Sequence, residues 1–298
     1  INKNFKLNIL KKKNFHTKVK KHYYQWEKGV QENDAYNTLK YIKKYKAKFV
    51  IVDHYALSHY WHKIISKHAK LIIIDDFLNK KIYSDLYINY HLIQKKKLKL
   101  TNILNSKCKI LLGPEYALLN KIKYKKTKNL SKRNILIYFG NVDKAGMTNK
   151  IVKLLNKIEN HYKFFVIIGK NNKNKKKILI LGKNNKNISF VTKSYKDLNN
   201  FYANCNSAIT GAGVSLYELI QFNRNIISIY SNNYQKKLTS NLEKKNVCKV
   251  ISYKKITPKN LKEFISTDKK NKIINRKYFD GHGPTRIYRF IKKLNKKY

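Results

Sequence analysis

A glycine turn between a strand and a helix is the stretch of this sequence best suited to bind an anion. Residues 205–222 read CNSAITGAGVSLYELIQF, an apolar strand, the turn Gly211-Ala212-Gly213 and a helix from about Ser215. Glycines permit a tight turn and let a ligand approach the backbone without meeting a Cβ atom. The helix start presents unpaired N–H groups and the positive end of the helix dipole. This arrangement predicts a site for a diphosphate.

Glu218 lies one helical turn further along, and its carboxylate has two open interpretations. It can bind the hydroxyl pair of a ribose, which would complete a nucleotide site. It can also form a capping box with Ser215, in which the glutamate only satisfies the free N–H groups of the helix start. A lone G-x-G turn does not decide between these two alternatives.

Polar residues also follow three apolar runs in the first half of the chain. The three clusters are Asp53-His54-Tyr55, Asp75-Asp76 and Gly113-Pro114-Glu115-Tyr116. Ligands of parallel α/β sheets bind outside the carboxyl ends of the strands, so each cluster is a candidate site. His54 can act as a general base or be a satisfied polar group at the sheet edge. The acids can bind a metal or cap helices, and the tyrosines can line a pocket or pack in the core.

The elements that would position these residues alternate between strand and helix. Short apolar runs predict strands at 3–10, 49–52, 71–74, 85–88, 109–112, 134–139, 164–168, 188–191, 207–210, 225–230 and 248–251. Helical spacing or caps predict helices at 33–45, 60–67, 149–158, 196–203, from about 215, and at 234–245, 258–265 and 285–296. Residues 171–177, rich in lysine and asparagine, are expected to be a loop. A lysine-rich break at 121–133 divides the pattern into two α/β halves, with a cleft between them.

Composition excludes several classes of protein. No apolar run approaches the eighteen or so residues of a membrane span, and no signal peptide is visible. The cysteines, Cys108, Cys205 and Cys248, lack metal or redox spacing and fit reduced thiols in the cytoplasm. The chain begins with Ile1 rather than methionine, so we expect it to be a fragment that has lost its N-terminus.

The net charge of +51 favours contact with anions, but its composition argues against nucleic-acid recognition. The basic residues include only five arginines, whereas readers of bases and phosphates usually use arginine forks. Abundant lysine, asparagine, isoleucine and tyrosine together are typical of an AT-rich genome. We therefore expect a solvated lysine surface, with a nucleic-acid binder as an alternative based on charge alone.

Six motifs in order resemble a known family. They are IVDHY (51–55), IIIDD (72–76), LLGPEYALL (111–119), ILIYFGNVD (135–143), ITGAGVSLYE (209–218) and FDGHGPTRIYRFI (279–291). They resemble the UDP-sugar hydrolases of pseudaminic acid biosynthesis (PseG) and, more broadly, the MurG-like glycosyltransferases of GT-B architecture. LLGPEYALL and VDHY are the motifs more specific to the hydrolases. The resemblance covers nearly the whole chain.

The resemblance implies two Rossmann-like domains that face a cleft, with the last helix packing back across it. Residues 1–126 would form the sugar or acceptor side and residues 127–298 the UDP-binding domain. The implied activity is hydrolysis of a UDP-linked 2,4-diacetamido-trideoxy sugar to free sugar and UDP, with no metal or other cofactor. Such a protein would be cytoplasmic.

The resemblance also assigns roles to individual residues. The diphosphate would contact the backbone of Gly211, Ala212, Gly213 and Val214, with Ser215 beside them. Glu218 would bind ribose, Gly140 would mark the phosphate side, and Gln235 would contact the sugar. Tyr55 and Tyr116 would line the sugar pocket. His54 and Tyr55 are the candidates for catalysis within this chain, and the main catalytic base is expected upstream of Ile1.

The sequence departs from this family in places. The family begins with a G-x-G-H-x-x-R turn whose histidine is thought to activate water, and nothing like it precedes INKNFKLNIL (1–10). Asn141 stands where the family often has a second glycine, Tyr234 where it has asparagine, and Asn89-Tyr90-His91 replaces a D-Q-N segment. Two alternatives stay open: a glycosyltransferase with another acceptor in place of water, and a nucleotide-sugar binding remnant without activity.

Overall fold

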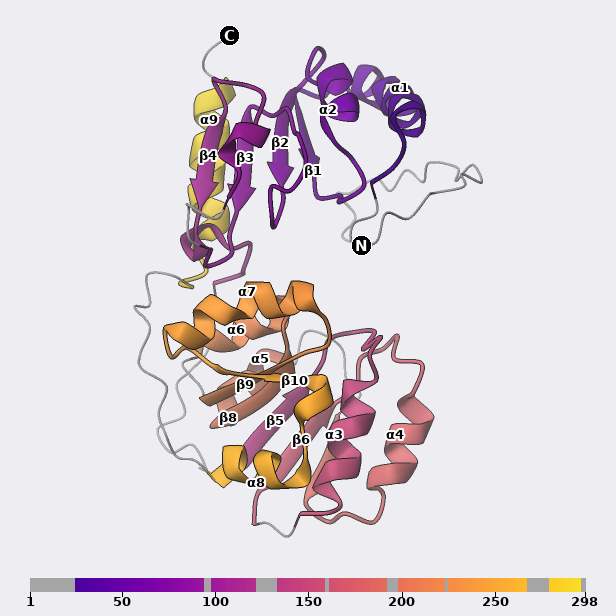
Figure 1. Cartoon of the computed structure of the whole chain (residues 1–298), viewed down its shortest axis with the longest axis vertical. Coiled ribbons are helices and arrows are strands. Elements are labelled where there is room, and N and C mark those ends of the chain that lie inside the picture. The colour runs from indigo at the N-terminus through magenta and orange to yellow at the C-terminus, as the bar shows by residue number, and fades with distance from the viewer. Residues whose placement is uncertain are drawn as a thin grey trace. The chain divides into compact units, whose positions relative to one another are not determined.

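The chain forms two compact α/β units in a computed structural model (Figure 1). Unit 1 comprises Ile1–Tyr116 with Arg289–Tyr298, and unit 2 comprises Ala117–Tyr288. The structure describes residues 25–93, 98–121, 133–158, 161–191, 198–222, 225–266 and 279–295. The strand expected at 3–10 and the domain boundary expected between residues 126 and 127 lie outside these described residues.

The described part of unit 1 contains a parallel sheet of four strands in the order β1-β2-β3-β4. Its elements are α1 (Lys28–Lys44), β1 (Phe49–Val52), α2 (His59–Ile65), β2 (Lys70–Ile74), β3 (Leu86–Asn89), η2 (Leu100–Asn102), β4 (Lys109–Leu112) and η3 (Pro114–Tyr116). Leu39 of α1 and Trp61 of α2 are buried in one core with Leu71 and Ile73 of β2. Because the strands are parallel, their carboxyl ends meet at one edge of the sheet.

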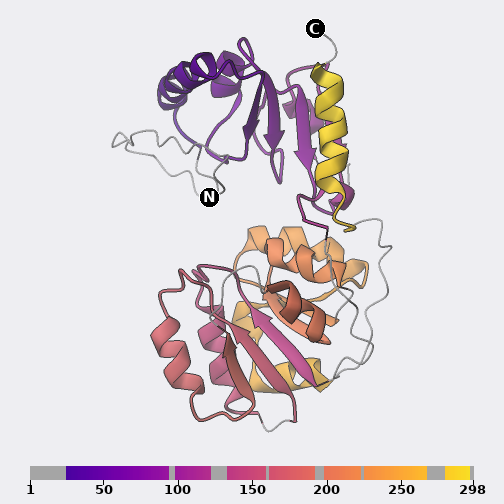
Figure 2. The ribbon, with the colours of Figure 1, turned by 180° about the vertical axis from the view of Figure 1, so that it is seen from behind.

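The last helix, α9 (Gly283–Asn295), returns the chain to unit 1. It lies beside β4 when the molecule is viewed from opposite sides (Figures 1 and 2). The ring of Phe290 packs edge-on against the ring of Tyr116, with centroids 6.4 Å apart. Unit 1 is therefore assembled from both ends of the chain.

Unit 2 contains, among the described residues, a parallel sheet of six strands in the order β10-β9-β8-β5-β6-β7. The strands are β5 (Asn134–Tyr138), β6 (Lys163–Ile167), β7 (Ile188–Val191), β8 (Ser207–Gly211), β9 (Asn225–Tyr230) and β10 (Lys249–Ser252). The helices are α3 (Met147–Leu155), α4 (Lys175–Gly182), α5 (Leu198–Asn204), α6 (Val214–Gln221), α7 (Asn233–Lys244), η5 (Tyr253–Lys255) and α8 (Pro258–Ser266). From β5 the chain runs outward to β7 and then returns to β8 on the other side of β5. The strand order therefore reverses between β5 and β8.

One face of the unit 2 sheet is covered by α3, α4 and α8. Ile151, Ile178 and Leu261 from these three helices lie in one core with Ile137 of β5 and Val166 of β6, and all five are buried. Apolar contact of this kind is the main source of stability for such layers. The sheet edge at the reversal point is thus held by a packed core.

The predicted α/β class with two units is confirmed, and every predicted strand within the described residues is present. Each of their ends agrees within one residue. The helix boundaries were less accurate. α1, expected from residue 33, begins at Lys28 with Glu27 at its N-cap, and α3, expected at 149–158, spans Met147–Leu155. The loop expected at 171–177 is wrong from Lys175 onward, where α4 begins.

The early start of α1 has a local cause in the side chain of Gln31. Its Nε2 donates to the carbonyl of Trp26 at 2.6 Å, and its Oε1 accepts from the backbone N–H of Ser58 at 2.7 Å. A buried amide with these partners ties the first helical turn to the loop before α2. The apolar pattern alone did not reveal this turn.

His62, buried on α2, makes unit 1 sensitive to acid. Its Nδ1 accepts from the backbone N–H of Tyr83 at 3.4 Å, which requires an unprotonated Nδ1. Burial, with smaller effects of Lys80 and His59, lowers the pKa of His62 from 6.5 to about 3. In the unfolded chain this histidine is protonated below about pH 6.5, whereas in the folded chain it is protonated only below about pH 3. The free energy of unfolding therefore falls as the pH is lowered from 6.5 to 3.

We expect this residue alone to reduce the free energy of unfolding by about 2 kcal/mol between pH 7 and pH 5. Both tryptophans of the chain, Trp26 and Trp61, lie in unit 1, so urea unfolding followed by tryptophan fluorescence reports this unit. His62→Gln should flatten the change between the two pH values, whereas His68→Gln, at an exposed site, should not. Equal losses in the wild type and in His62→Gln would refute the assignment.

Candidate functional site

The carboxyl ends of β5 and β8 meet in the middle of the unit 2 sheet, where the strand order reverses. Tyr138 pairs with Thr210, and Thr210 Oγ1 donates to the carbonyl of Tyr138 at 2.7 Å. The chain leaves β5 through Gly140 and leaves β8 through Gly211–Gly213, so the structure brings both predicted glycine segments to this point. Ligands of open parallel sheets bind outside such a reversal.

The start of α6 differs from the helix starts beside it. Its N-cap, Gly213, has no side chain to offer, and its first turn carries no acidic residue. At α3, by contrast, the Asp143 carboxylate accepts from two backbone N–H groups, each at 2.9 Å. At α7, Asn232 Oδ1 accepts from the backbone N–H of Gln235 at 2.9 Å. Among the helices that follow β5, β8 and β9, α6 is the one whose first N–H groups lack a side-chain acceptor in the described residues, as an external anion requires.

Gly213 is not required by the backbone conformation. Its φ of −113° and ψ of −162° are accessible to any residue, so the bend of the chain at residues 212–213 does not itself require glycine at position 213. A Cβ atom placed on Gly213 would have no neighbour within 4 Å, whereas one on Gly169 would lie 2.3 Å from the carbonyl oxygen of Asn141. The space in front of Gly213 is therefore open. Gly140, with φ of 85°, is the glycine here that the backbone does demand.

Glu218 does not form the capping box that the sequence allowed. β8 pairs with β9 as far as Gly211, and Gly213 is the N-cap, so Ser215 already lies inside the helix. The Glu218 Oε2 instead accepts from the Tyr202 hydroxyl at 3.1 Å. Burial raises the pKa of Glu218 above its usual 4.5, against a smaller opposing effect of the Tyr202 hydrogen bond. The carboxylate is partly buried, and among the described residues burial and Tyr202 are the causes of its pKa shift, which makes Glu218 a candidate ligand-binding residue.

Gln235, predicted to contact a sugar, is hydrogen-bonded within the start of α7. Its Oε1 accepts from the backbone N–H of Ser231 at 2.8 Å and from Ser231 Oγ at 3.1 Å. Its own backbone N–H donates to Oδ1 of the N-cap residue Asn232 at 2.9 Å. The second bond is an ordinary N-cap bond, and the first ties the residue before the N-cap to the first helical turn. The side-chain oxygen is thus committed within the protein, and a sugar contact by Gln235 would have to use Nε2.

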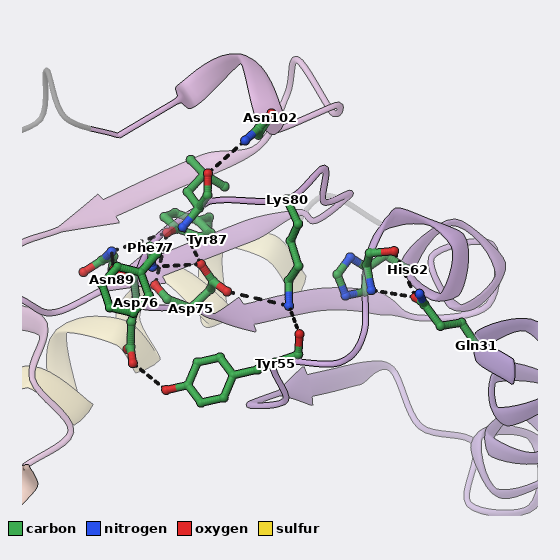
Figure 3. Close-up of polar contacts among 12 residues, drawn as sticks. Gln31, Tyr55, His62, Asp75, Asp76, Phe77, Lys80, Tyr87, Asn89 and Asn102 are labelled. Atoms are coloured by element: carbon green, nitrogen blue, oxygen red, sulfur yellow. Dashed lines mark hydrogen bonds and ion pairs between the residues drawn. The ribbon is translucent and has the colours of Figure 1, made fainter. Parts of the chain in front are cut away.

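A second polar network lies at the carboxyl edge of the unit 1 sheet (Figure 3). Asp76, after β2, accepts a short hydrogen bond from the Tyr55 hydroxyl, and its other carboxylate oxygen lies 2.7 Å from His91 Nε2. Asn89 Nδ2 donates to the carbonyl of Asp76 at 2.8 Å. Asp76, Asn89 and His91 are buried, whereas Tyr55 is 44% exposed. Three strand ends are thus linked through one buried carboxylate.

Lys80 holds the same edge from the opposite end of Tyr55 (Figure 3). Its Nζ donates to the backbone carbonyl of Tyr55 and lies 3.9 Å from Asp75 Oδ2. Asp75 Oδ1 in turn accepts from the backbone N–H groups of Phe77 at 3.1 Å and Leu78 at 2.6 Å. Tyr55 is therefore fixed at its backbone by Lys80 and at its hydroxyl by Asp76, while its ring stays half exposed.

The remaining predicted residues of unit 1 lie at the same edge. His54 is exposed beside the ring of Trp26, with centroids 5.1 Å apart. Partial burial, then the nearby Lys80 charge, lowers the pKa of His54 below 6.5, which favours the neutral form at pH 7. Asp53 has its pKa raised by burial and by the Asp76 charge. Tyr116 is partly buried and packs against Phe290.

Sequence reasoning missed two of these side chains. Tyr202 belongs to no motif, and nothing in its neighbourhood along the chain marks it. His91 was noted only as a departure from the family pattern, although its place after β3 carried a signal. In parallel sheets the residues after each strand converge, so His91 was a candidate partner for Asp76.

Within the described residues, no group of three or more histidine, cysteine, aspartate or glutamate side chains is arranged to hold a metal ion. No helix among them has the length and apolar character needed to cross a membrane.

Comparison with known families gives a match in unit 2. Residues 134–277 match the glycosyltransferase family 28 C-terminal domain. An uncharacterised protein of Methanocaldococcus jannaschii is 25% identical over 232 residues. That alignment covers 73% of this chain and 47% of the relative, so the chain spans about half the length of the relative.

Solved structures of GT-B type resemble the chain along most of its length. S. aureus MnaA, solved with UDP, has a TM-score of 0.64 and 15% identity, and the match covers 91% of this chain and 79% of that one. MurG of Acinetobacter baumannii has a TM-score of 0.60 and 12% identity, covering 88% and 78%. The UDP-GlcNAc 2-epimerase of M. jannaschii has a TM-score of 0.57 and 15% identity, covering 89% and 82%. At these low identities the likeness shows the fold alone. That fold is the two-domain GT-B fold expected from the sequence.

Proposed function

We propose that the chain binds a UDP-linked diacetamido-trideoxy sugar and hydrolyses it to free sugar and UDP. The observation that carries the nucleotide part is the uncapped start of α6 at the β5/β8 reversal, with open space in front of Gly213. The match of residues 134–277 to a glycosyltransferase C-terminal domain and the likeness to S. aureus MnaA, solved with UDP, support the choice of nucleotide. The sugar and the hydrolysis rest on the resemblance of the motifs.

In this proposal the diphosphate lies against the start of α6. The backbone N–H groups of residues 211–214 bind its oxygens, and the helix dipole favours its charge. Gly140 lets the chain turn away at the end of β5, beside this position. Glu218 accepts from a ribose hydroxyl through the carboxylate oxygen that Tyr202 does not use.

The reaction is a single displacement at the anomeric carbon of the sugar. A water oxygen forms the new bond to that carbon as its bond to the diphosphate oxygen breaks, and the electron pair leaves with UDP. The start of α6 stabilises the charge that develops on UDP. His54 is the proposed acceptor of the water proton, because its lowered pKa keeps the imidazole neutral at pH 7. Tyr55, held by Asp76 and Lys80, is the proposed sugar contact beside it.

A glycosyltransferase is the second candidate. The match to the glycosyltransferase family 28 C-terminal domain favours it, because the proteins that give this family its name transfer the sugar to an acceptor other than water. Incubation of the UDP-sugar with and without an added sugar or lipid acceptor separates the two. Release of free sugar without acceptor supports the hydrolase, and product formation that requires the acceptor supports the transferase.

Calorimetric titration of UDP into the wild type and Glu218→Gln tests the nucleotide site. We expect saturable binding at one site in the wild type and about tenfold weaker binding in the variant, which loses a charge-assisted hydrogen bond to ribose. Without ligand, the same variant should melt at a higher temperature than the wild type at pH 7.5. The reason is that the raised pKa of Glu218 makes the folded state less favourable as pH rises through it, and glutamine carries no charge.

No saturable UDP binding in a folded wild-type sample would overturn the nucleotide site. Glu218→Ala is the less suitable variant here, because it would also leave the buried Tyr202 hydroxyl without its acceptor. Glutamine keeps an acceptor for Tyr202 in its Oε1, removes the charge and replaces the second carboxylate oxygen, the proposed ribose acceptor, with an amide NH2 donor. Unchanged affinity for UDP in Glu218→Gln would remove the ribose role.

A further inference from the structure

We propose that Tyr202 of α5 is the positioning residue that fixes one oxygen of Glu218 and thereby presents the other to the ribose. It would set the preference of the site for ribonucleotides over deoxyribonucleotides. The inference rests on the proposed function, since it concerns the same nucleotide site. It assigns a role to a side chain that lies inside the protein and does not itself touch the ligand.

Three residues that contact Tyr202 lie on one face of α6. Ser215, Glu218 and Phe222 are spaced by three and four residues, so their side chains point in the same direction from the helix. The Tyr202 hydroxyl donates to Glu218 Oε2 at 3.1 Å, and Ser215 hydrogen-bonds the same hydroxyl. The ring lies edge-on to Phe222, with centroids 5.6 Å apart. Both the hydroxyl and the ring of Tyr202 are therefore in contact with α6, the helix whose N-terminus forms the proposed nucleotide site.

The burial of Tyr202 restricts its hydroxyl to hydrogen-bond partners inside the protein. Tyr202 is 1% exposed, so its hydroxyl cannot turn to water and must use partners inside the protein. A tyrosine hydroxyl can donate once and accept as well, which fits donation to Glu218 and acceptance from Ser215. Hydrogen bonds in such a chain strengthen one another in surroundings of low polarity. Donation from Ser215 therefore strengthens the bond that holds Glu218.

The position of the Glu218 carboxylate links this series of hydrogen bonds to the choice between ribose and deoxyribose. Glu218 is only partly buried, so the carboxylate reaches the surface while one of its oxygens is tied inside. With that oxygen fixed, rotation of the carboxylate is restricted, and the second oxygen faces one direction. A fixed acceptor discriminates strongly between a ligand that brings a hydroxyl to it and one that lacks the hydroxyl.

If the pairing of Tyr202 with Glu218 served only the stability of the fold, a different experimental result would be expected. If Glu218 only satisfied the buried hydroxyl of Tyr202, removing that hydroxyl would change stability but not the choice between ligands. The test is therefore the ratio of two affinities, those for UDP and for 2′-deoxy-UDP, in wild type and Tyr202→Phe. Phenylalanine keeps the ring contact with Phe222 and removes only the hydroxyl.

We expect the wild type to bind UDP about tenfold more tightly than 2′-deoxy-UDP, as measured by calorimetry. Tyr202→Phe should reduce this preference to about twofold by weakening UDP, with the affinity for 2′-deoxy-UDP almost unchanged. Tyr217→Phe is the matched control. Tyr217 is also buried and adjoins Glu218 in sequence, but its ring stacks on Phe279, with centroids 5.1 Å apart. It should keep the wild-type preference.

The outcomes separate this inference from the function on which it rests. A folded wild type that binds neither nucleotide overturns both. A wild type that prefers UDP, with an equal preference in Tyr202→Phe, overturns the positioning role and leaves the nucleotide site intact. Equal weakening of both ligands in Tyr202→Phe, with a lower melting temperature, assigns Tyr202 to structure alone and also overturns the inference.

Discussion

Replacing Gly213 with valine is expected to abolish UDP binding, with at least a hundredfold loss of affinity, while the protein stays folded. The branched side chain would occupy the open space in front of the α6 start, where the diphosphate is proposed to approach. The fold should tolerate it because φ is −113° and a Cβ atom meets nothing within 4 Å. Calorimetric titration of UDP and a thermal melt of the same sample measure the two properties separately.

Gly29→Val is the matched control for this variant. Gly29 lies on α1 in unit 1, and a Cβ atom there also meets nothing within 4 Å. The same chemical change is thus made at a site with equal space and no proposed ligand. UDP affinity should be that of the wild type. Retained UDP binding in a folded Gly213→Val protein would remove the phosphate assignment of residues 211–214.

Replacing Asp76 with alanine should lower the free energy of unfolding of unit 1 by about 3 kcal/mol. The change removes the shared acceptor of Tyr55 and His91 and leaves a buried imidazole without its carboxylate. Loss of one partner from a buried polar pair is costly because the other partner stays desolvated. Urea unfolding followed by tryptophan fluorescence reports this unit, since Trp26 and Trp61 both belong to it.

Glu32→Ala provides the comparison for Asp76→Ala. Glu32 faces solvent on α1 and pairs with Lys28 across one turn at 3.8 Å. Exposed pairs of this kind contribute about 0–1 kcal/mol, so its loss should change stability by less than about 0.5 kcal/mol. If Asp76→Ala proved as mild as Glu32→Ala, the network at the unit 1 edge would not be the rigid support described above.

The inner strands were predictable from sequence because strands buried on both faces form short, nearly continuous apolar runs. β2 and β9 illustrate this, since the inner positions of each are buried and, apart from Ser228, apolar. Helix starts were less predictable. The first turn of α1 depends on Gln31 reaching Trp26 and Ser58, a contact between distant residues that no periodicity encodes. α4 was missed because lysines fill its solvent side and only Ile178 and Gly182 are buried.

Some features of the candidate site could likewise be predicted from the sequence, and others could not. The position of residues 211–218 at a sheet edge followed from the strand–turn–helix pattern. The role of Glu218 did not, because the N-cap position depends on how far β8 pairs with β9. A side-chain N-cap is found instead at α7, where Asn232 accepts from the backbone N–H of Gln235. Tyr202 and Glu218 are 16 residues apart in sequence, and only the folded chain brings their oxygens within 3.1 Å.

The open space at Gly213 also bears on how the protein tolerates mutation. At Gly169 a side chain would collide with the backbone, and at Gly140 the dihedral angle disfavours one, so selection for folding alone keeps both glycines. At Gly213 folding places no such demand. In a library of variants sorted only for soluble expression, residue 213 should drift freely, and in one sorted for nucleotide binding it should stay glycine. The difference between the two libraries would map the ligand-facing surface without a bound ligand.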